Sequence, residues 1–232
     1  MTPRFLRAHD PLDRDALAHF LAQTLPGARV ERDSAALGSV HAYLTFGGLA
    51  IHLEAGKANT PRGPRVPWMT AAVALPTHGL EIDWVREFNA RAYQVPVVRE
   101  GAFIGTGGPA ELVAATFDPG IRAALGALAS ADALDRVEIR NDRVVLHLNG
   151  WPADAATSSF VLETAHAIAS RVGHGVGAFL ASGRAIDGDA TLAAYRAGLG
   201  RSAQIGKLIL LGLLVLLLAI VGFAILVIVL IG

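Results

Sequence analysis

The chain has 232 residues, 53% of them hydrophobic, and its 20 basic and 20 acidic side chains cancel to a formal net charge of zero. This balance argues against a large cationic surface, so we expect no nucleic-acid partner. The absence of cysteine excludes disulfides, thiolate nucleophiles and cysteine-ligated metal sites.

The first elements are a helix and a β-hairpin. The spacing predicts a helix over residues 12–25, with Leu12, Ala16, His19 and Phe20 on one face, ended by Pro26-Gly27. Strand-like runs follow at 28–32, 40–46 and 49–54. Gly47-Gly48 lies between the last two, and both glycines tolerate the positive φ of a tight hairpin turn.

That turn sets the register of the hairpin. Phe46 should pair with Leu49, Leu44 with Ile51 and Ala42 with Leu53, which gives one apolar face. On the other face His41 lies opposite Glu54, and Tyr43 opposite His52. The two histidines lie diagonally across the strands without an identifiable third ligand, so a polar sheet face is favoured over a metal site.

A Pro/Gly loop is expected over residues 55–67, and it carries Lys57, Arg62 and Arg65 just before Trp68. A solvated loop is the favoured interpretation, and contact with anionic lipid headgroups is the alternative. Strands are then expected at 68–75, 80–87, 95–98 and 102–104. The strand at 80–87 carries three alternating carboxylates, Glu81, Asp83 and Glu87. Paired carboxylates catalyse glycoside hydrolysis, but any half-exposed strand shows the same alternation of charged and apolar residues.

The segment from Gly105 to Ala110 formally matches a dinucleotide-binding turn, GxGxxA. A helix is predicted at 109–116 and a second one after it, capped by Asp118 with Pro119 at its first position and running to about residue 129. That second helix occupies the place of the strand that the fingerprint requires, so a flexible turn is favoured.

A second hairpin is predicted from strands 136–140 and 143–148, joined at Asn141-Asp142. Its apolar face comprises Val137, Ile139, Val144, Leu146 and Leu148. An amphipathic helix over 154–172 follows, with Ser158-Ser159 near its start. The chain then loosens over 173–188, and a weaker helix is expected at roughly 189–205.

Residues 103–172 read FIGTGGPAELVAATFDPGIRAALGAL, then DRVEIRNDRVVLHLNGW, then a helix. This order resembles bacterial membrane-anchored families of unknown function, in which a short aromatic-started strand leads to two helices, a two-stranded hairpin and a final helix. The chain departs from them at Asn141-Asp142, where a glycine-containing turn is more usual. The resemblance implies architecture and membrane association, and no catalytic residue is carried over.

The run from Leu208 to Gly232 contains no charged or hydrogen-bonding side chain. As a helix, residues 208–231 would cover about 36 Å, enough for a hydrocarbon layer of about 30 Å. Arg196, Arg201 and Lys207 precede the run and are the expected membrane-interface residues. Together with an N-terminus that lacks an apolar signal region, they place the preceding residues in the cytoplasm, at a bacterial inner membrane.

The expected fold class is α+β, with antiparallel hairpins packed by helices and followed by one C-terminal transmembrane helix. The cytoplasmic domain should cover 1–175, as one body or as two halves at about 1–100 and 101–175, with a partly helical linker over 176–207. We expect a single-pass, tail-anchored module that interacts with an unknown protein or lipid partner, with no cofactor, metal or catalytic residue assigned. The alternative is a tethered enzyme or small-ligand-binding domain, which a cleft collecting His41, His52, Glu81 and Asp83 would favour.

Overall fold

The computed structural model describes residues 2–7, 13–25, 27–33, 38–60, 63–90 and 96–186, with the side chains of 59, 60 and 63–65 left out. All of them belong to one compact unit. The helices are α1 (Arg14–Thr24), α2 (Ala110–Thr116), α3 (Pro119–Ser130) and α4 (Ala155–Ala181), with a 3-10 turn, η1 (Glu87–Asn89). The strands are β1 (Phe5–Leu6), β2 (Arg29–Arg32), β3 (Val40–Phe46), β4 (Leu49–Thr60), β5 (Gly63–Ala74), β6 (Ile82–Arg86), β7 (Pro96–Glu100), β8 (Phe103–Gly107), β9 (Leu134–Arg140), β10 (Arg143–Asn149) and β11 (Trp151–Pro152).

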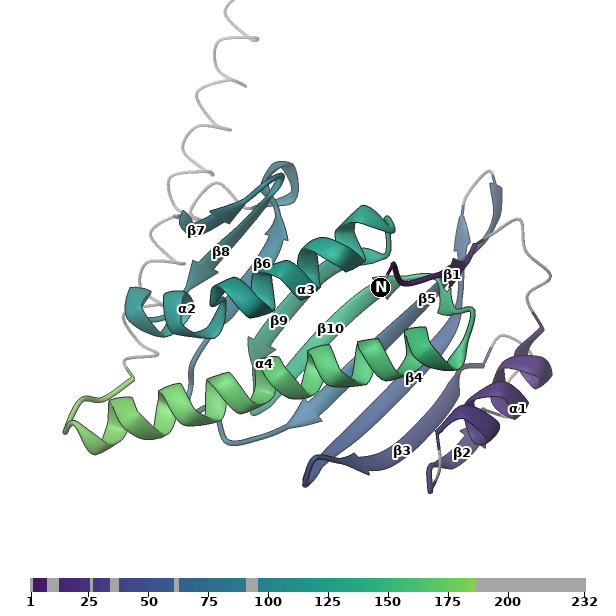
Figure 1. Ribbon diagram of the computed structural model, residues 1–232, viewed down its shortest axis with the longest axis horizontal. Coiled ribbons are helices and arrows are strands. Elements are labelled where there is room, and N and C mark those ends of the chain that lie inside the picture. The colour runs from purple at the N-terminus through teal and green to yellow at the C-terminus, as the bar shows by residue number, and fades with distance from the viewer. Residues whose placement is uncertain are drawn as a thin grey trace, which may run out of the picture. The chain divides into compact units, whose positions relative to one another are not determined.

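Nine of the described strands form one sheet in the order β2-β3-β4-β5-β10-β9-β6-β8-β7, and every neighbouring pair is antiparallel. Helices α2, α3 and α4 cross one face of this sheet, and α1 lies against β2 and β3 (Figure 1). Their buried side chains form a single cluster with one side of the strands. Among the described residues no helix covers the opposite face. The expected α+β class with antiparallel sheets and helices is confirmed.

The first hairpin has the predicted register. Phe46 pairs with Leu49, Leu44 with Ile51 and Ala42 with Leu53. Gly47 and Gly48 have φ angles of 55° and 82°, as the turn requires. Side chains of Ala42, Ile51 and Leu53 enter the core, while His41, Tyr43 and His52 lie on the uncovered face.

The second hairpin also forms as predicted, with Val137, Ile139, Val144, Leu146 and Leu148 at 2% exposure or less. Asn141 and Asp142 both adopt positive φ without a glycine. The Asp142 carboxylate accepts hydrogen bonds from the Thr77 backbone N–H at 2.8 Å and from its hydroxyl at 3.1 Å. These bonds help to offset backbone strain of about 1–2 kcal/mol for each of the two residues, which explains why a non-glycine turn is tolerated here.

The loop predicted over residues 55–67 is wrong, because β4 and β5 continue through it as a long hairpin. Gly56 pairs with Trp68, and a Cβ at Gly56 would come within 2.9 Å of the indole ring. The buried Trp151 donates its indole N–H to the carbonyl oxygens of both Gly56 and Trp68, at 3.1 Å each. Pairing and a buried hydrogen bond therefore override the turn-like composition.

The predicted face of the first helix is wrong in part: Phe20 packs against the core, and Leu12 lies outside the described residues. Ala16 and His19 are exposed, whereas Leu17, Ala18 and Leu21 are the buried positions of α1. These three residues follow the i, i+1, i+4 spacing of a helix face and pack with the core side of the sheet.

The loosening predicted after residue 172 is wrong as well, since α4 runs on to Ala181. Three glycines in this stretch each disfavour helix by about 1 kcal/mol, but burial of Val176 and Phe179 outweighs them. A Cβ at Gly175 would lie 3.4 Å from Leu112 of α2, so the small residue allows close approach of the two helices. The N-terminus of α3 is as predicted: the Asp118 side chain accepts the N–H of Ile121, and Pro119 occupies the first turn.

The two predicted hairpins are joined through β5, which pairs with β4 on one side and, over seven residues from Trp68 to Ala74, with β10 on the other. The linker predicted over 176–207 begins inside α4, and its residues 187–207 lie outside the described residues, as do the apolar run at 208–231 and Arg196, Arg201 and Lys207. Within the described part of the chain, no single helix has the length and apolarity to span a membrane. Helices α2 and α3 together reach that length and composition, but with a bend of 66° between them.

Candidate functional site

Three rings form a stacked group on the uncovered face, where β3 and β4 pair. Tyr43 and His52 are directly opposite each other, with ring centroids 4.6 Å apart and planes only 4° from parallel. His41 lies diagonally beside them, 5.3 Å from the His52 ring. Arg29 of the edge strand places its guanidinium 5.5 Å from the Tyr43 ring centre.

The two histidines share a hydrogen bond. His41 Nδ1 lies 3.1 Å from His52 Nε2, so one nitrogen donates and the other accepts. The other nitrogen of His41 lies 3.5 Å from the Asp33 carboxylate. Burial lowers the pKa of His52, the neighbouring His41 and Arg143 lower it further, and Glu54 partly opposes them. His52 is therefore predominantly neutral at neutral pH.

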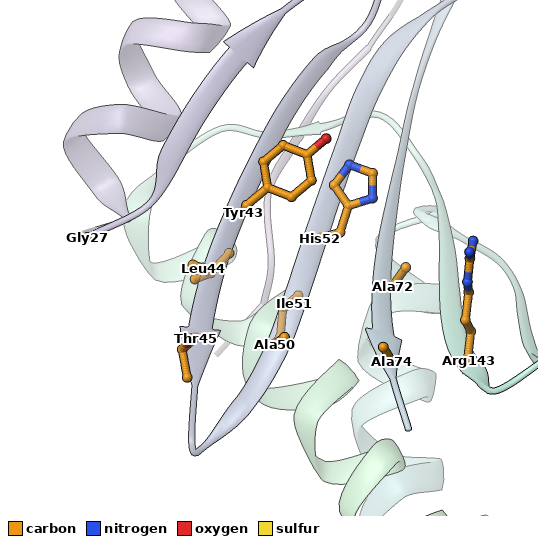
Figure 2. Close-up of a pocket in the computed structure, with 10 residues that line it drawn as sticks. All are labelled: Gly27, Tyr43, Leu44, Thr45, Ala50, Ile51, His52, Ala72, Ala74 and Arg143. Carbon is orange, nitrogen blue, oxygen red and sulfur yellow. The ribbon is translucent and has the colours of Figure 1, made fainter. Parts of the chain in front are cut away.

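Beside this group the sheet is hollowed. The hollow measures about 530 Å³, and its lining on the uncovered face comprises Tyr43, Thr45, Ala50, His52, Ala72, Ala74 and Arg143. The alanines form an apolar floor across β4 and β5. Figure 2 shows His52 and Arg143 on either side of Ala72 and Ala74. The space exists because small side chains occupy the positions between these larger ones.

Arg143 is the cation of this hollow. It begins β10 opposite Ala74, and its side chain is exposed. Among the described residues it makes no ion pair and no hydrogen bond through its side chain. The hollow thus combines an apolar floor with one uncompensated positive charge.

A second group of charges, on β6, β9 and β10, is internally paired. Arg140 contacts Asp83, and Arg136 lies 2.9 Å from the Glu138 carboxylate. The hydrogen bond from His147 lowers the pKa of Glu138 to about 2, and Arg136 and Arg140 assist, against the opposing effect of burial. This cluster stabilises the sheet and leaves little charge for a ligand.

The structure separates the residues that an enzymatic cleft would have gathered. His41 and His52 are neighbours, but Asp83 lies on β6, four strands from β4, or about 19 Å at the usual strand spacing. Asp83 is paired with Arg140, and Glu87 lies in η1, where it forms a 2.5 Å ion pair with Arg99. Asp83 and Glu87 are thus each held by an arginine, and Glu81, the third carboxylate of the predicted alternation, precedes β6.

The glycine-rich segment is part of the sheet. Gly105 to Gly107 belong to β8 and pair with β6, and the Gly108 N–H donates to the Glu81 carbonyl at 2.7 Å. Gly105 to Gly107 are therefore strand and not the flexible turn that the sequence favoured, and the Gly108 N–H, one of the donors that a phosphate would need, is occupied.

Other candidates have structural roles. Ser158 is buried in the first turn of α4 and donates to the Asp154 carbonyl at 3.3 Å. Lys57 lies on β4 with its ammonium 5.5 Å from the Trp151 ring centre, while Arg62 and the Arg65 side chain are outside the described residues. No group of three metal-ligating side chains occurs in the described ranges.

Comparisons with known proteins do not assign the chain to a family. No family model matches the chain, and no curated protein matches its sequence. Among solved structures, the crystal structure of the mycobacterial trehalose monomycolate transport factor A has a TM-score of 0.48 at 9% identity, covering 68% of this chain and 96% of that one. A similarity at this level carries no functional argument.

Sequence reasoning identified Tyr43 and His52 as opposite neighbours but missed Arg143 and the alanine floor. The signal was the recurrence of alanine at 72 and 74 in a strand otherwise suited to larger side chains. The two alanines indicate a hollow only once β5 is placed between β4 and β10, because this order sets His52 and Arg143 on either side of them.

Proposed function

We propose that the chain is a membrane-tethered binding module that acts on a protein or lipid partner through the uncovered face of its sheet. The observation that carries this proposal is the arrangement of that face. It holds an open hollow and paired surface charges, and the candidate catalytic groups lie on strands far apart from one another.

The tether is proposed to be residues 208–231, because their apolar length of about 36 Å matches a bilayer core. Arg196, Arg201 and Lys207 precede that run and favour a cytoplasmic location for the domain, at a bacterial inner membrane. The second candidate function is small-ligand binding, which the hollow beside His52 favours.

The tether is tested by alkaline extraction of membranes from expressing cells. The full chain should remain in the membrane pellet, and a chain ending at Gly200 should be released. A substitution of Arg for Leu217, which costs about 3 kcal/mol at the bilayer centre, should weaken retention. Membrane retention of the shortened chain after extraction would refute the assignment of the tether to 208–231.

Orientation is tested with a protease-sensitive tag at Met1. The tag should be protected in intact spheroplasts and cleaved after lysis. Cleavage from outside would place the domain in an extracytoplasmic compartment and overturn the cytoplasmic proposal.

Use of the uncovered face is tested by photocrosslinking in cells. A crosslinking amino acid at Thr70 reports on that face, and the same probe at Glu163 reports on the exposed surface of α4. A discrete protein or lipid adduct from position 70 and none from 163 supports the proposal. Equal labelling from both positions, or from 163 alone, would contradict it.

A further inference from the structure

The hollow beside His52 has the size of a small-molecule site. Its volume of about 530 Å³ falls within the range of roughly 300–1,000 Å³ typical of ligand pockets. A macromolecule would cover the whole sheet face, whereas this space accommodates one compact group.

Its floor is apolar because three alanines from two neighbouring strands lie side by side. Ala72 pairs with His52 and with Val145, and Ala74 pairs with Arg143. A short hydrocarbon portion placed there would cover apolar surface without displacing a hydrogen-bonded group.

Its wall carries a cation that differs from the others on this face. Arg29, Arg99, Arg136 and Arg140 each form an ion pair with a carboxylate. Arg143 forms none with any described residue, although it lies near enough to influence His52. A guanidinium recognises carboxylate and phosphate oxygens through paired N–H donors.

Further donors line the same space. Tyr43 and Thr45, which carry hydroxyl groups, are lining residues on β3, and the His52 nitrogen that does not contact His41 makes no hydrogen bond among the described residues. These groups suit the polar end of a ligand rather than its apolar part.

We propose that the hollow binds the carboxylate or phosphate group of a small amphiphile, with Arg143 as its counter-ion and Ala50, Ala72 and Ala74 beneath its short apolar part. The inference rests on the proposed use of the uncovered face and names the chemistry of one site on it. It does not depend on the tether.

The test is calorimetric titration of the full chain in phosphatidylcholine nanodiscs, or in buffer if the chain does not insert. The probes are butyl phosphate, butyrate and inorganic phosphate. At least one of the two amphiphilic anions should bind, and butyl phosphate should bind more tightly than inorganic phosphate, because only the butyl group reaches the alanine floor. Equal affinity of those two phosphates would overturn the apolar part of the proposal.

The variants separate this site from general charge effects. Arg143→Gln should weaken binding by about tenfold to a hundredfold, as expected for loss of a charge-assisted contact. Arg99→Gln is the matched control: it removes the same charge four strands away and should leave affinity unchanged. Ala72→Leu fills the hollow while keeping Arg143, and should also abolish binding of the amphiphilic anions. Unchanged affinity in Arg143→Gln would refute the site.

A second titration identifies the source of the ligand. Vesicles of phosphatidylcholine that contain phosphatidic acid, whose headgroup phosphate is anionic, are added to the nanodisc-bound chain. Arg143-dependent capture of these vesicles without binding of soluble anions points to a lipid headgroup. Binding of soluble anions alone points to a free metabolite. If neither probe binds, this inference fails, while crosslinking from Thr70 still tests the module.

Discussion

The turn of the first hairpin offers a matched pair of substitutions, Gly47→Ala and Gly48→Ala. Both glycines adopt positive φ, at 55° and 82°, so alanine at either position should cost about 1–2 kcal/mol of backbone strain. The two positions differ in their surroundings. A Cβ at Gly48 meets nothing within 4 Å, whereas a Cβ at Gly47 would lie 2.2 Å from Nε2 of His166.

His166 must therefore move in Gly47→Ala. It then loses its hydrogen bond to the Gly47 carbonyl, at 3.2 Å, and its edge contact with Phe46, whose ring centre is 5.6 Å away. Each contact contributes about 0.5–1.5 kcal/mol. We expect Gly47→Ala to cost about 2–5 kcal/mol in total, roughly 1–3 kcal/mol more than Gly48→Ala.

The assay is urea denaturation of the full chain in neutral detergent, followed by tryptophan fluorescence. Trp84 and Trp151 are buried in the domain and report on its unfolding. In a His166→Ala background the difference between the two glycine variants should vanish, because the obstructing ring and its contacts are already absent. Equal costs in the wild-type background, or an excess for Gly47→Ala that persists without His166, would refute the packing of α4 on this turn.

Three further predictions test the fold by the same denaturation assay. Leu146→Asp places a charge at a position with 0% exposure and should unfold the domain. Arg143→Asp changes an exposed position and should alter the free energy of unfolding by less than about 0.5 kcal/mol. If the two variants lost stability equally, the strand register would be wrong. Glu138→Gln should cost at most about 3 kcal/mol near pH 7, since the pKa of Glu138 falls from 4.5 to about 2 on folding. A lowered carboxyl pKa stabilises the fold above pH 4.5, and this contribution is lost as the pH falls towards 2, so the variant and the wild type should converge in acid; a constant difference down to pH 2 would argue against the ionised contact. Asp118→Ala removes the cap of α3, whose carboxylate accepts the Ile121 N–H at 2.9 Å, and should cost about 1 kcal/mol; no measurable loss would show that the cap is dispensable.

Charge reversal at Arg140, another outward position of the second hairpin, should be destabilising, unlike the same change at Arg143. Its guanidinium contacts Asp83 of β6 and lies 3.7 Å from Glu138. An aspartate there would face two carboxylates. The difference between Arg140 and Arg143 arises from the neighbouring strand β6, which is distant in sequence.

Local features of the sequence were sufficient to predict the register of both hairpins and the first residue of α3. A two-residue turn with positive φ fixes which residues pair, and the period of two then assigns each side chain to a face. For the same reason the opposition of Tyr43 and His52 could be derived without a structure. Asp118 followed by Pro119 identifies a helix start because both residues act within one turn.

Only the tertiary structure decided where those elements end and what they bring together. Residues 55–60 and 63–67 are strand because β4 and β5 bond to each other and the Trp151 indole binds their backbone. Helix α4 continues past Gly173 because Val176 and Phe179 are buried in the core. The hollow exists because β5 lies between β4 and β10, which sets Arg143 across two alanines from His52. Pairing between distant strands depends on the burial that the whole domain achieves, and no short stretch of sequence specifies it.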